Sequence, residues 1–272
     1  MKKRLPLPGF ALSLGYTLTY ISIIIFLPLA ALAWKSSELS LEQFFETISN
    51  KRSIAAIQLT FSSAFVAAAI NMIIGLVVAW VFVRYDFPFK WWIDALIDLP
   101  FALPTAVAGL VYANLYTPTG WIGRYLIKIG IDISYTSTAI VLVLVFTGFP
   151  FVVRAVQPVL EEIDSDIEEA SSILGASRWQ TFSFVIWPIL RPAVVTGFAL
   201  ALARGLGEYG SVIFVSSNLP GKTEVAPTLI VAKIEENKYA EATAIAIVLL
   251  AASFALLGFI NFWERWSRRY ET

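Results

Sequence analysis

Neither cysteine nor histidine occurs among the 272 residues of this chain. Without cysteine there is no disulfide framework and no thiol nucleophile. Without histidine the chain also lacks the base of a Ser-His triad and the imidazole ligands of common zinc and haem sites. These absences leave little scope for catalysis, and we expect a non-enzymatic protein with no metal or cofactor of its own.

The chain also lacks an excess of either charge, because 20 Lys and Arg balance 20 Asp and Glu. This balance gives no sign of a nucleic-acid partner. Apolar residues, in contrast, make up 58% of the chain, above the roughly 45–50% of soluble domains. The mean hydropathy is +0.73. The excess lies in long uncharged runs, which indicate a protein that spans a bilayer and contacts its lipids.

These runs predict an all-α polytopic membrane protein with six transmembrane helices. A helix needs about 20 apolar residues to cross the hydrocarbon core. The fifth run is short because Arg204 and Glu208 interrupt it, so we extend that span over residues 189–215. The first run is much longer than a signal-peptide core of roughly 7–15 residues, so we expect it to be retained. The runs cover residues 5–34, 53–83, 99–123, 133–153, 192–203 and 242–263.

The spans divide the chain into three expected sections: an N-terminal helix and outer loop at 1–56, the main transmembrane domain at 57–263, and a basic cytosolic tail at 264–272. With the N-terminus inside, inner segments carry 11 Lys and Arg against 8 in outer loops. Cytoplasmic loops are generally the richer in these residues. We therefore expect both termini to be cytosolic, and short interfacial helices in the outer loops.

The polar loop between the fourth and fifth spans has the pattern of a helical hairpin. Ser165 with Glu168, and Ser177 with Gln180, have the spacing of capping boxes, each of which marks a helix start. Gly175 suits the left-handed position that ends a helix. The first helix is predicted at residues 166–174, and the second is predicted to stop before Pro188.

The first helix of this hairpin is acidic on one face, with Asp166, Glu168 and Glu169. One interpretation is an ordinary amphipathic loop on the membrane surface. Surface helices, however, favour Lys and Arg on their polar face because lipid headgroups are often anionic. The acidic face therefore favours docking to a basic groove of a partner protein.

Glu169-Ala170-Ser171, followed by Gly175 and then Trp187-Pro188, resembles the EAA–Gly–Leu–Pro loop of bacterial ABC importer permeases. Ser171 stands in place of the third-position Ala, and Trp187 in place of the Leu before Pro. The resemblance implies a type I ABC importer permease fold, in which this loop is the coupling helix seated in a cleft of a separate ATPase. It assigns ATPase coupling to Glu168, Glu169, Ala170, Gly175, Ala176 and Pro188.

A wider resemblance, to the T-type permease subunits of sulfate/thiosulfate importers, covers nearly the whole chain. It implies a bacterial plasma-membrane location, a W-type permease partner, two copies of a cytosolic ATPase that holds ATP and magnesium, and an outer substrate-binding protein. Molybdate or tungstate is the alternative cargo, because these are also tetrahedral dianions. The likeness rests on Leu7-Pro8-Gly9-Phe10, residues 94–105, Pro150-Phe151-Val152-Val153-Arg154, residues 156–162 and Gly207-Glu208-Tyr209-Gly210.

Charged residues within the apolar runs are candidates for the translocation pathway. Arg204 in a membrane span needs a partner or a water-lined cavity, and Glu208 follows one helical turn later. The two readings are an ion pair that stabilises one helix and an anion route lined by Arg204, with Glu208 setting its geometry. A stripe of small residues precedes them and favours packing within the subunit or against the partner permease. It comprises Ala193, Gly197, Ala201 and Gly205.

The third run contains Pro100 and Pro104, which free backbone carbonyls and kink a helix. A simple bend for packing is one interpretation. The other is a broken helix that lines the cavity, with Thr105 facing the substrate. Asp98 lies just before the prolines, and we expect it either on this route or paired with an Arg that the sequence does not identify.

Other functional classes fit less well. Glycines at positions 205, 207 and 210 match a dinucleotide-binding spacing, but no strand precedes them. Asp94 and Asp98 on one helical turn are a poor acid pair for an intramembrane protease. In a passive channel the capped hairpin would have no partner to bind and no function. No Walker A motif occurs, so ATP hydrolysis is expected of a partner.

Overall fold

The computed structural model describes residues 9–268, apart from the side chains of residue 165 and of residues 264–268. Throughout this range the regular structure is helical, as predicted. The residues before Gly9 and the side chains of the expected basic tail lie outside the described part. The main helices are α1 (Phe10–Ile21), α2 (Leu27–Ser36), α3 (Leu41–Ser49), α4 (Lys51–Arg84), α9 (Ser137–Glu161), α12 (Trp187–Leu206), α14 (Ala226–Glu235) and α15 (Tyr239–Arg268).

Five helical segments in the described range are long and apolar enough to cross a membrane. Two of these segments each contain a short π-helical turn. In the first segment η1 (Ser22–Phe26) links α1 to α2, and in the fourth η2 (Thr181–Ile186) links α11 (Arg178–Gln180) to α12. The five segments are Phe10–Ser36, Lys51–Arg84, Ser137–Glu161, Arg178–Leu206 and Tyr239–Trp263.

The predicted third span is not one continuous helix, so the count of six such helices is not confirmed. The predicted span at 99–123 contains α6 (Leu99–Ala102) and α7 (Thr105–Tyr116), and α5 (Lys90–Ile97) precedes it. Pro100 lies in the first turn of α6, where a proline is tolerated. Leu103 is extended, with ψ of 132°, because the following Pro104 disfavours helical geometry. The prolines therefore break the helix here and do more than bend it.

The core of the protein is a three-helix packing of α4, α9 and α12. Small residues allow these helices to approach closely: a Cβ on Gly197 would lie 2.8 Å from Val152 Cα, and one on Gly205 would lie 3.2 Å from Ala64 Cβ. Ala201 is also buried. This part of the small-residue stripe thus packs within the subunit, which confirms the first of its two interpretations.

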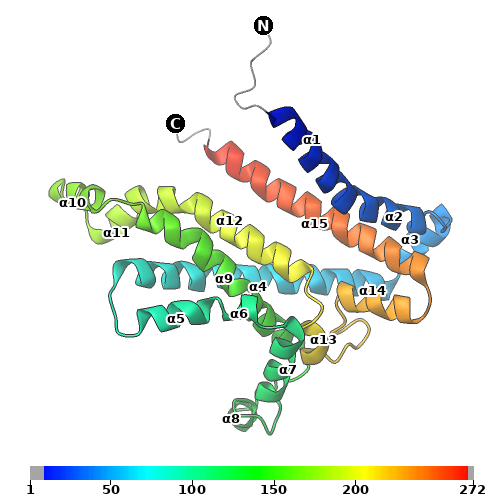
Figure 1. Ribbon diagram of the computed structural model, residues 1–272. Coiled ribbons are helices and arrows are strands. Elements are labelled where there is room, and N and C mark those ends of the chain that lie inside the picture. Colours follow the sequence, from blue (N-terminus) through cyan, green and yellow to red (C-terminus); the bar gives the residue numbers. More distant parts are fainter. Residues whose placement is uncertain (1–8, 269–272) are drawn as a thin grey trace.

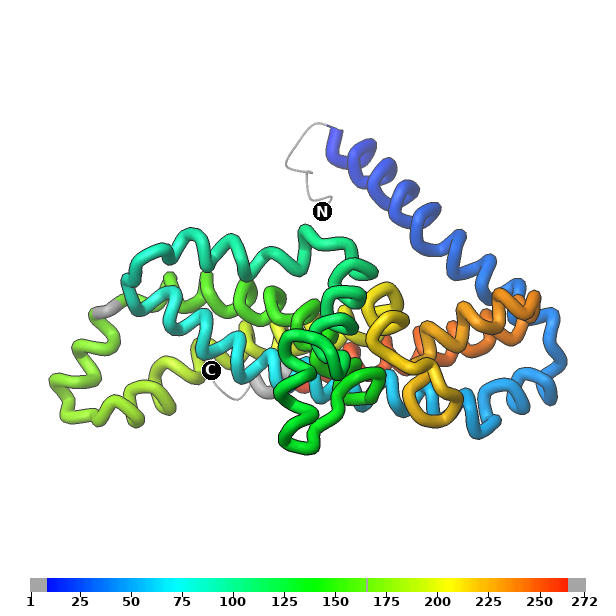
Figure 2. The backbone as a smooth tube through the Cα atoms, turned by 90° about the horizontal axis from the view of Figure 1, so that it is seen from below, coloured from blue at the N-terminus to red at the C-terminus, as the bar shows by residue number. Residues whose placement is uncertain are grey.

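The helices leave two distinct ends on the molecule. The hairpin, with α10 (Ser165–Ile173) and α11, lies at one end, while α3 and α14 lie at the other (Figure 1). The helix α4 runs between these ends. α2 packs on α15, whereas α1 stands apart from the rest of the bundle (Figure 2). The short helices α3 and α8 (Gly123–Lys128) occupy the two loops that were predicted to hold interfacial helices.

Candidate functional site

The first limb of the hairpin is α10, and its start differs from the prediction. Asp164 is the N-cap, and its side chain accepts a hydrogen bond from Asp166 N at 3.2 Å. The expected Ser165–Glu168 capping box is therefore wrong: the acidic residue one position earlier takes the capping role. At the other end Gly175 has φ of +82°, and Ala176 N donates to Ser171 O at 3.1 Å. This is the left-handed glycine turn that was predicted.

The second limb begins as predicted, but it does not end at Pro188. Ser177 and Gln180 form the expected capping box, with Ser177 N donating to Gln180 Oε1 at 2.8 Å. The chain then passes through η2, where Trp187 N–H donates to Phe182 O. This five-residue spacing places Pro188 in the first turn of α12, where its missing N–H is tolerated. The hairpin is consequently continuous with a membrane-spanning segment.

The two residues that depart from the ABC-permease pattern both hold the hairpin together. Ser171 Oγ donates to Glu168 O at 2.8 Å and lies 2.8 Å from Thr181 Oγ1. An alanine at this position would lack the bond between α10 and η2. The Trp187 ring packs near that of Phe182, with centroids 6.4 Å apart. The contact of Ser171 thus joins the two limbs, whereas that of Trp187 lies within the second limb and connects η2 to α12.

The tip of the hairpin presents apolar side chains to its surroundings. Ile173 and Leu174 are 85% and 87% exposed, and Trp179 is 74% exposed. Glu169, Ala170 and Gly175 are also exposed, while Ala176 and Pro188 are half-buried. An exposed cluster of large apolar residues at the end of a molecule is typical of a surface that a partner covers.

Glu168 does not belong to the free acidic face that the sequence predicted. Its carboxylate forms an ion pair with Arg84, the last residue of α4. The Arg84 guanidinium also lies over the Trp80 ring, 5.6 Å from its centroid, and Trp80 meets Phe182 edge-on at 5.7 Å. The exposed acidic residues of α10 are therefore Asp166 and Glu169, and Glu168 fastens the hairpin to α4.

Arg204 and Glu208 form the expected ion pair, although the helix that carries Arg204 is shorter than predicted. α12 ends at Leu206, and the residues up to Val215 belong to a loop and to α13 (Val212–Val215). Glu208 is only 2% exposed, and its Oε1 accepts from both Ser211 N at 3.0 Å and Ser211 Oγ at 2.8 Å. The buried carboxylate is fully partnered, as a buried charge must be.

Thr105 lies close to the segment that contains Glu208. A Cβ on Gly210 would clash with Thr105 Oγ1, and a Cβ on Gly109 would clash with the Ser211 backbone. Glycine at these positions therefore allows α7 to pack directly on residues 207–211. The structure brings three predicted pathway residues, Thr105, Arg204 and Glu208, to neighbouring elements.

Asp98 lies in a separate cluster, and its partner is Arg154 of α9. Arg154 Nε donates to Asp98 Oδ1 at 2.9 Å and its Nη2 to Asp98 Oδ2 at 2.7 Å. Its Nη1 donates to Asp94 Oδ1 and to Gln157 Oε1, both at 2.8 Å. Such a two-pronged guanidinium–carboxylate pair is strong and directional. It joins α9 to the broken segment of α5 and α6.

Arg154 also borders a cavity of about 600 Å³ between α6, α9 and α12. Phe101 and Phe151 pack edge-on beside it, with ring centroids 5.1 Å apart. Thr196 is the other polar side chain in the lining. Within the part of the chain described by the structure, no group of three or more acidic side chains is placed to hold a metal ion.

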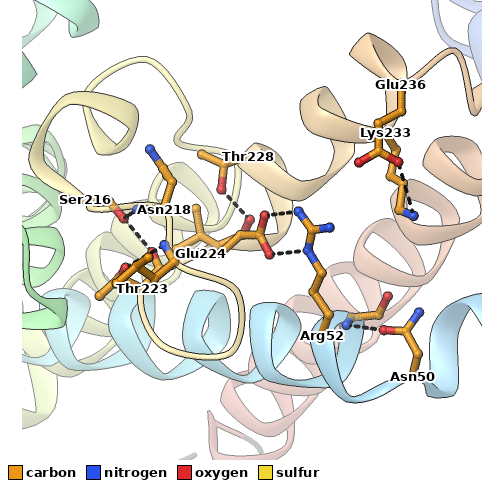
Figure 3. Close-up of polar contacts among 12 residues, drawn as sticks. Asn50, Arg52, Ser216, Asn218, Thr223, Glu224, Thr228, Lys233 and Glu236 are labelled. Atoms are coloured by element: carbon orange, nitrogen blue, oxygen red, sulfur yellow. Dashed lines mark hydrogen bonds and ion pairs between the residues drawn. The ribbon is translucent and has the colours of Figure 1, made fainter.

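Sequence reasoning missed a polar cluster at the opposite end of the molecule (Figure 3). Glu224 is 4% exposed, and both its oxygens accept from Arg52, at 2.7 and 2.8 Å. The loop around it is closed by Ser216 Oγ, which donates to Thr223 O at 2.6 Å. No local motif marks this pair, because 172 positions separate its members.

Comparison of the sequence with known proteins identifies the family of this chain. A family model described as "binding-protein-dependent transport system inner membrane component" matches residues 71–269. The chain is 48% identical to the sulfate transport system permease protein CysT of Escherichia coli K12, over 96% of this chain and 94% of the relative. It is 46% identical to each of the sulfate transport system permease proteins CysT of Salmonella typhimurium and Synechocystis.

The fold is also found among solved structures. A chain of a bacterial alginate ABC transporter, crystallised with an alginate pentasaccharide-bound periplasmic protein, superposes with a TM-score of 0.78 at 17% identity. The match covers 94% of this chain and 93% of that one. The protein therefore belongs to the family of binding-protein-dependent transport system inner membrane components, the permease subunits of ABC importers.

Proposed function

We propose that this chain is the T-type permease subunit of an ATP-driven sulfate importer. The observation that carries this proposal is the 46–48% identity, over nearly the full chain, with sulfate transport permeases from three organisms. Molybdate import is the less favoured alternative. Thiosulfate is included in the proposal because it shares the tetrahedral dianionic shape of sulfate.

The complete importer contains partners that supply what this chain lacks. The family name itself specifies a binding protein. Because we propose that import is driven by ATP and this chain has no Walker A sequence, we assign ATP hydrolysis to a separate ATPase. We assign the second half of the pathway to a W-type permease subunit, and ATP hydrolysis with magnesium to two cytosolic ATPase copies. In this assembly the chain has no catalytic role of its own.

The exposed hairpin tip is the part that meets the ATPase. Leu174 and Ile173 fill an apolar cleft, and the small Ala170 allows close approach. Glu169 meets a basic or backbone donor at the rim of that cleft, while Gly175 sets the angle between the limbs. Because η2 continues into α12, nucleotide-driven movement of the hairpin moves a spanning helix with it.

The anion route follows the side of the molecule where Arg204 and Arg154 lie. Each of these cations is already neutralised by carboxylates. A dianion therefore meets a weakened positive potential, which favours passage over retention. Thr105, Arg204, Glu208 and Asp98 are the positions that we assign to this route.

In the orientation that we propose, the hairpin and both termini face the cytosol of a bacterium, and the α3–α14 end lies outside the plasma membrane. The longest span, α4, has 34 residues, about 51 Å of helix. A bilayer with its headgroups is about 40–45 Å thick. An α4 of this length reaches from one aqueous face to the other.

The test is to reconstitute the complete importer in lipid and to measure ATP hydrolysis with the binding protein and a single oxyanion. Sulfate is expected to stimulate hydrolysis at lower concentration than molybdate. Stimulation by molybdate alone would assign the complex to the alternative cargo. Hydrolysis that responds to no oxyanion, or a functional complex without an ATPase, would contradict the proposal.

A further inference from the structure

The helix α4 carries an arginine near each end, and each arginine is ion-paired to a different loop of the protein. Arg84 pairs with Glu168 of the hairpin, and Arg52 pairs with Glu224 of the loop before α14. The two pairs thus join one helix to the two segments that lie at opposite ends of the molecule (Figure 1).

The inner end of α4 holds both limbs of the hairpin. Arg84 fixes α10 through Glu168, and Trp80, one turn earlier, meets Phe182 of η2. The Ser171–Thr181 contact joins the two limbs to each other. A displacement of the hairpin is therefore transmitted to the last two turns of α4, because both limbs contact this end of the helix and are bonded to each other.

The outer end of α4 holds the loop of residues 216–225 in a comparable way. Arg52 donates two hydrogen bonds to the buried carboxylate of Glu224 (Figure 3). Directly after this loop, Ala226 N, at the start of α14, donates to Thr60 Oγ1 of α4 at 2.8 Å. The tip of the same loop, at residues 219–222, is exposed and open to a partner.

α4 is also the stiffest of the three core helices. It contains no proline, and its single glycine, Gly75, is packed tightly against Val152. In contrast, α9 contains Pro150 and Pro158, and α12 contains Pro192 and follows a π-helical turn. Prolines and π-turns are the usual sites at which helices bend, so α4 transmits axial movement with the least deformation.

We propose that α4 is a rigid strut that carries the signal of binding-protein docking from the outer loop to the ATPase, with Arg52, Glu224, Arg84 and Glu168 as positioning residues at its ends. This inference rests on the proposed function, and it assigns the exposed tip of loop 216–225 to contact with the loaded binding protein. Neither ion pair touches the anion. Their role is to hold each loop at a fixed position relative to the strut.

The test uses the complete importer in lipid nanodiscs, with sulfate and the binding protein as probes. The variants are Arg52→Lys, Arg84→Lys and the double variant. Lysine keeps the charge, so no carboxylate is left unpaired, but it lacks the two-pronged geometry of arginine. Lys233→Arg is the matched control, because it also keeps the charge and because Lys233 pairs with Glu241 at 2.7 Å, a residue outside α4.

Basal ATP hydrolysis without binding protein is expected to be unchanged in every variant. Stimulation by the sulfate-loaded binding protein is expected to fall at least fivefold in each single variant, the lower end of typical coupling factors. The double variant should lose no more than the worse single variant, because both pairs act in series along one path.

Wild-type stimulation in either single variant, or an equal loss in the Lys233→Arg control, would overturn the strut while leaving the proposed function intact. Additive losses in the double variant would show that the two ends act independently, which also contradicts the inference. A wild-type complex that sulfate does not stimulate would instead remove the proposed function, and the strut with it.

Discussion

At the scale of single residues, Arg154 and Arg204 lie within membrane-spanning helices with their partners already in position. Glu208 is nearly inaccessible, yet it has Arg204 on one oxygen and Ser211 on the other. Arg154 uses all its guanidinium nitrogens in bonds to Asp94, Asp98 and Gln157. Such complete satisfaction reduces the large cost of a charge in the bilayer.

We predict that Arg204→Ala destabilises the protein by about 3 kcal/mol, because removing one partner of a buried pair leaves an uncompensated charge. The double variant Arg204→Ala/Glu208→Gln should recover much of this loss. Its neutral amide oxygen can still accept the two bonds from Ser211. The measurement is the thermal denaturation midpoint of the purified protein in detergent.

The control for this series is Lys35→Ala, which removes an exposed ion pair with Glu38. Exposed pairs contribute about 0–1 kcal/mol, so its midpoint should stay near that of the wild type. If the single and double variants at positions 204 and 208 have the same denaturation midpoint, the carboxylate of Glu208 is not an uncompensated charge in the single variant.

At the scale of elements, local signals were recovered from the sequence and long-range partners were not. The Ser177–Gln180 box and the Gly175 turn depend on neighbouring residues, and both are confirmed. The neighbouring box at Ser165 is wrong because Asp164, one residue earlier, competes for the same cap. The Arg partner of Asp98 lies 56 positions away, so no spacing rule could name Arg154.

The same limit applies to the two proline-containing helix boundaries. Pro188 was predicted to end a helix, but the π-turn of η2 accommodates it at the start of α12. For the third span the sequence left a bend and a broken helix open, and the extended Leu103, which separates α6 from α7, agrees with the broken helix. In both cases the proline was recognised, while its outcome depended on how the neighbouring helices packed.

The broken segment gives an element-scale prediction. Arg154 holds α5 and α6 against α9, and we expect Arg154→Lys to release them because lysine cannot make the two-pronged contact. Hydrogen exchange of the backbone amides of α5 should become at least tenfold faster, which corresponds to about 1.4 kcal/mol of local stability. The amides of α9 should remain protected.

Arg124→Lys serves as the comparison for this experiment, because Arg124 lies on α8, where it contacts the neighbouring Tyr125. It should leave exchange in α5 unchanged. Unaltered exchange of α5 in Arg154→Lys would mean that the packing of Phe101 on Phe151 alone holds the segment.

At the scale of the whole molecule, the two functional ends are separated by the length of α4. The hairpin is formed by residues 165–186 and the outer polar cluster by residues 216–225, so only one spanning helix, α12, separates them in sequence. An odd number of crossings places them on opposite faces of a membrane. The family of the chain was predictable from the hairpin motif, but this pairing of two ends through α4 required the structure.

The opposite placement of these ends can be tested directly, because the chain contains no cysteine. Ser172→Cys introduces one thiol on the exposed hairpin, and Lys222→Cys introduces one on the exposed outer loop. In intact spheroplasts a membrane-impermeant maleimide should label position 222 and leave position 172 unlabelled. Permeabilised spheroplasts should give labelling at both. The unmodified chain is the blank, since it offers no thiol. Labelling of position 172 from outside would place the hairpin away from any cytosolic ATPase and would contradict both the coupling role and the strut, because each requires the hairpin and the loop to face different compartments.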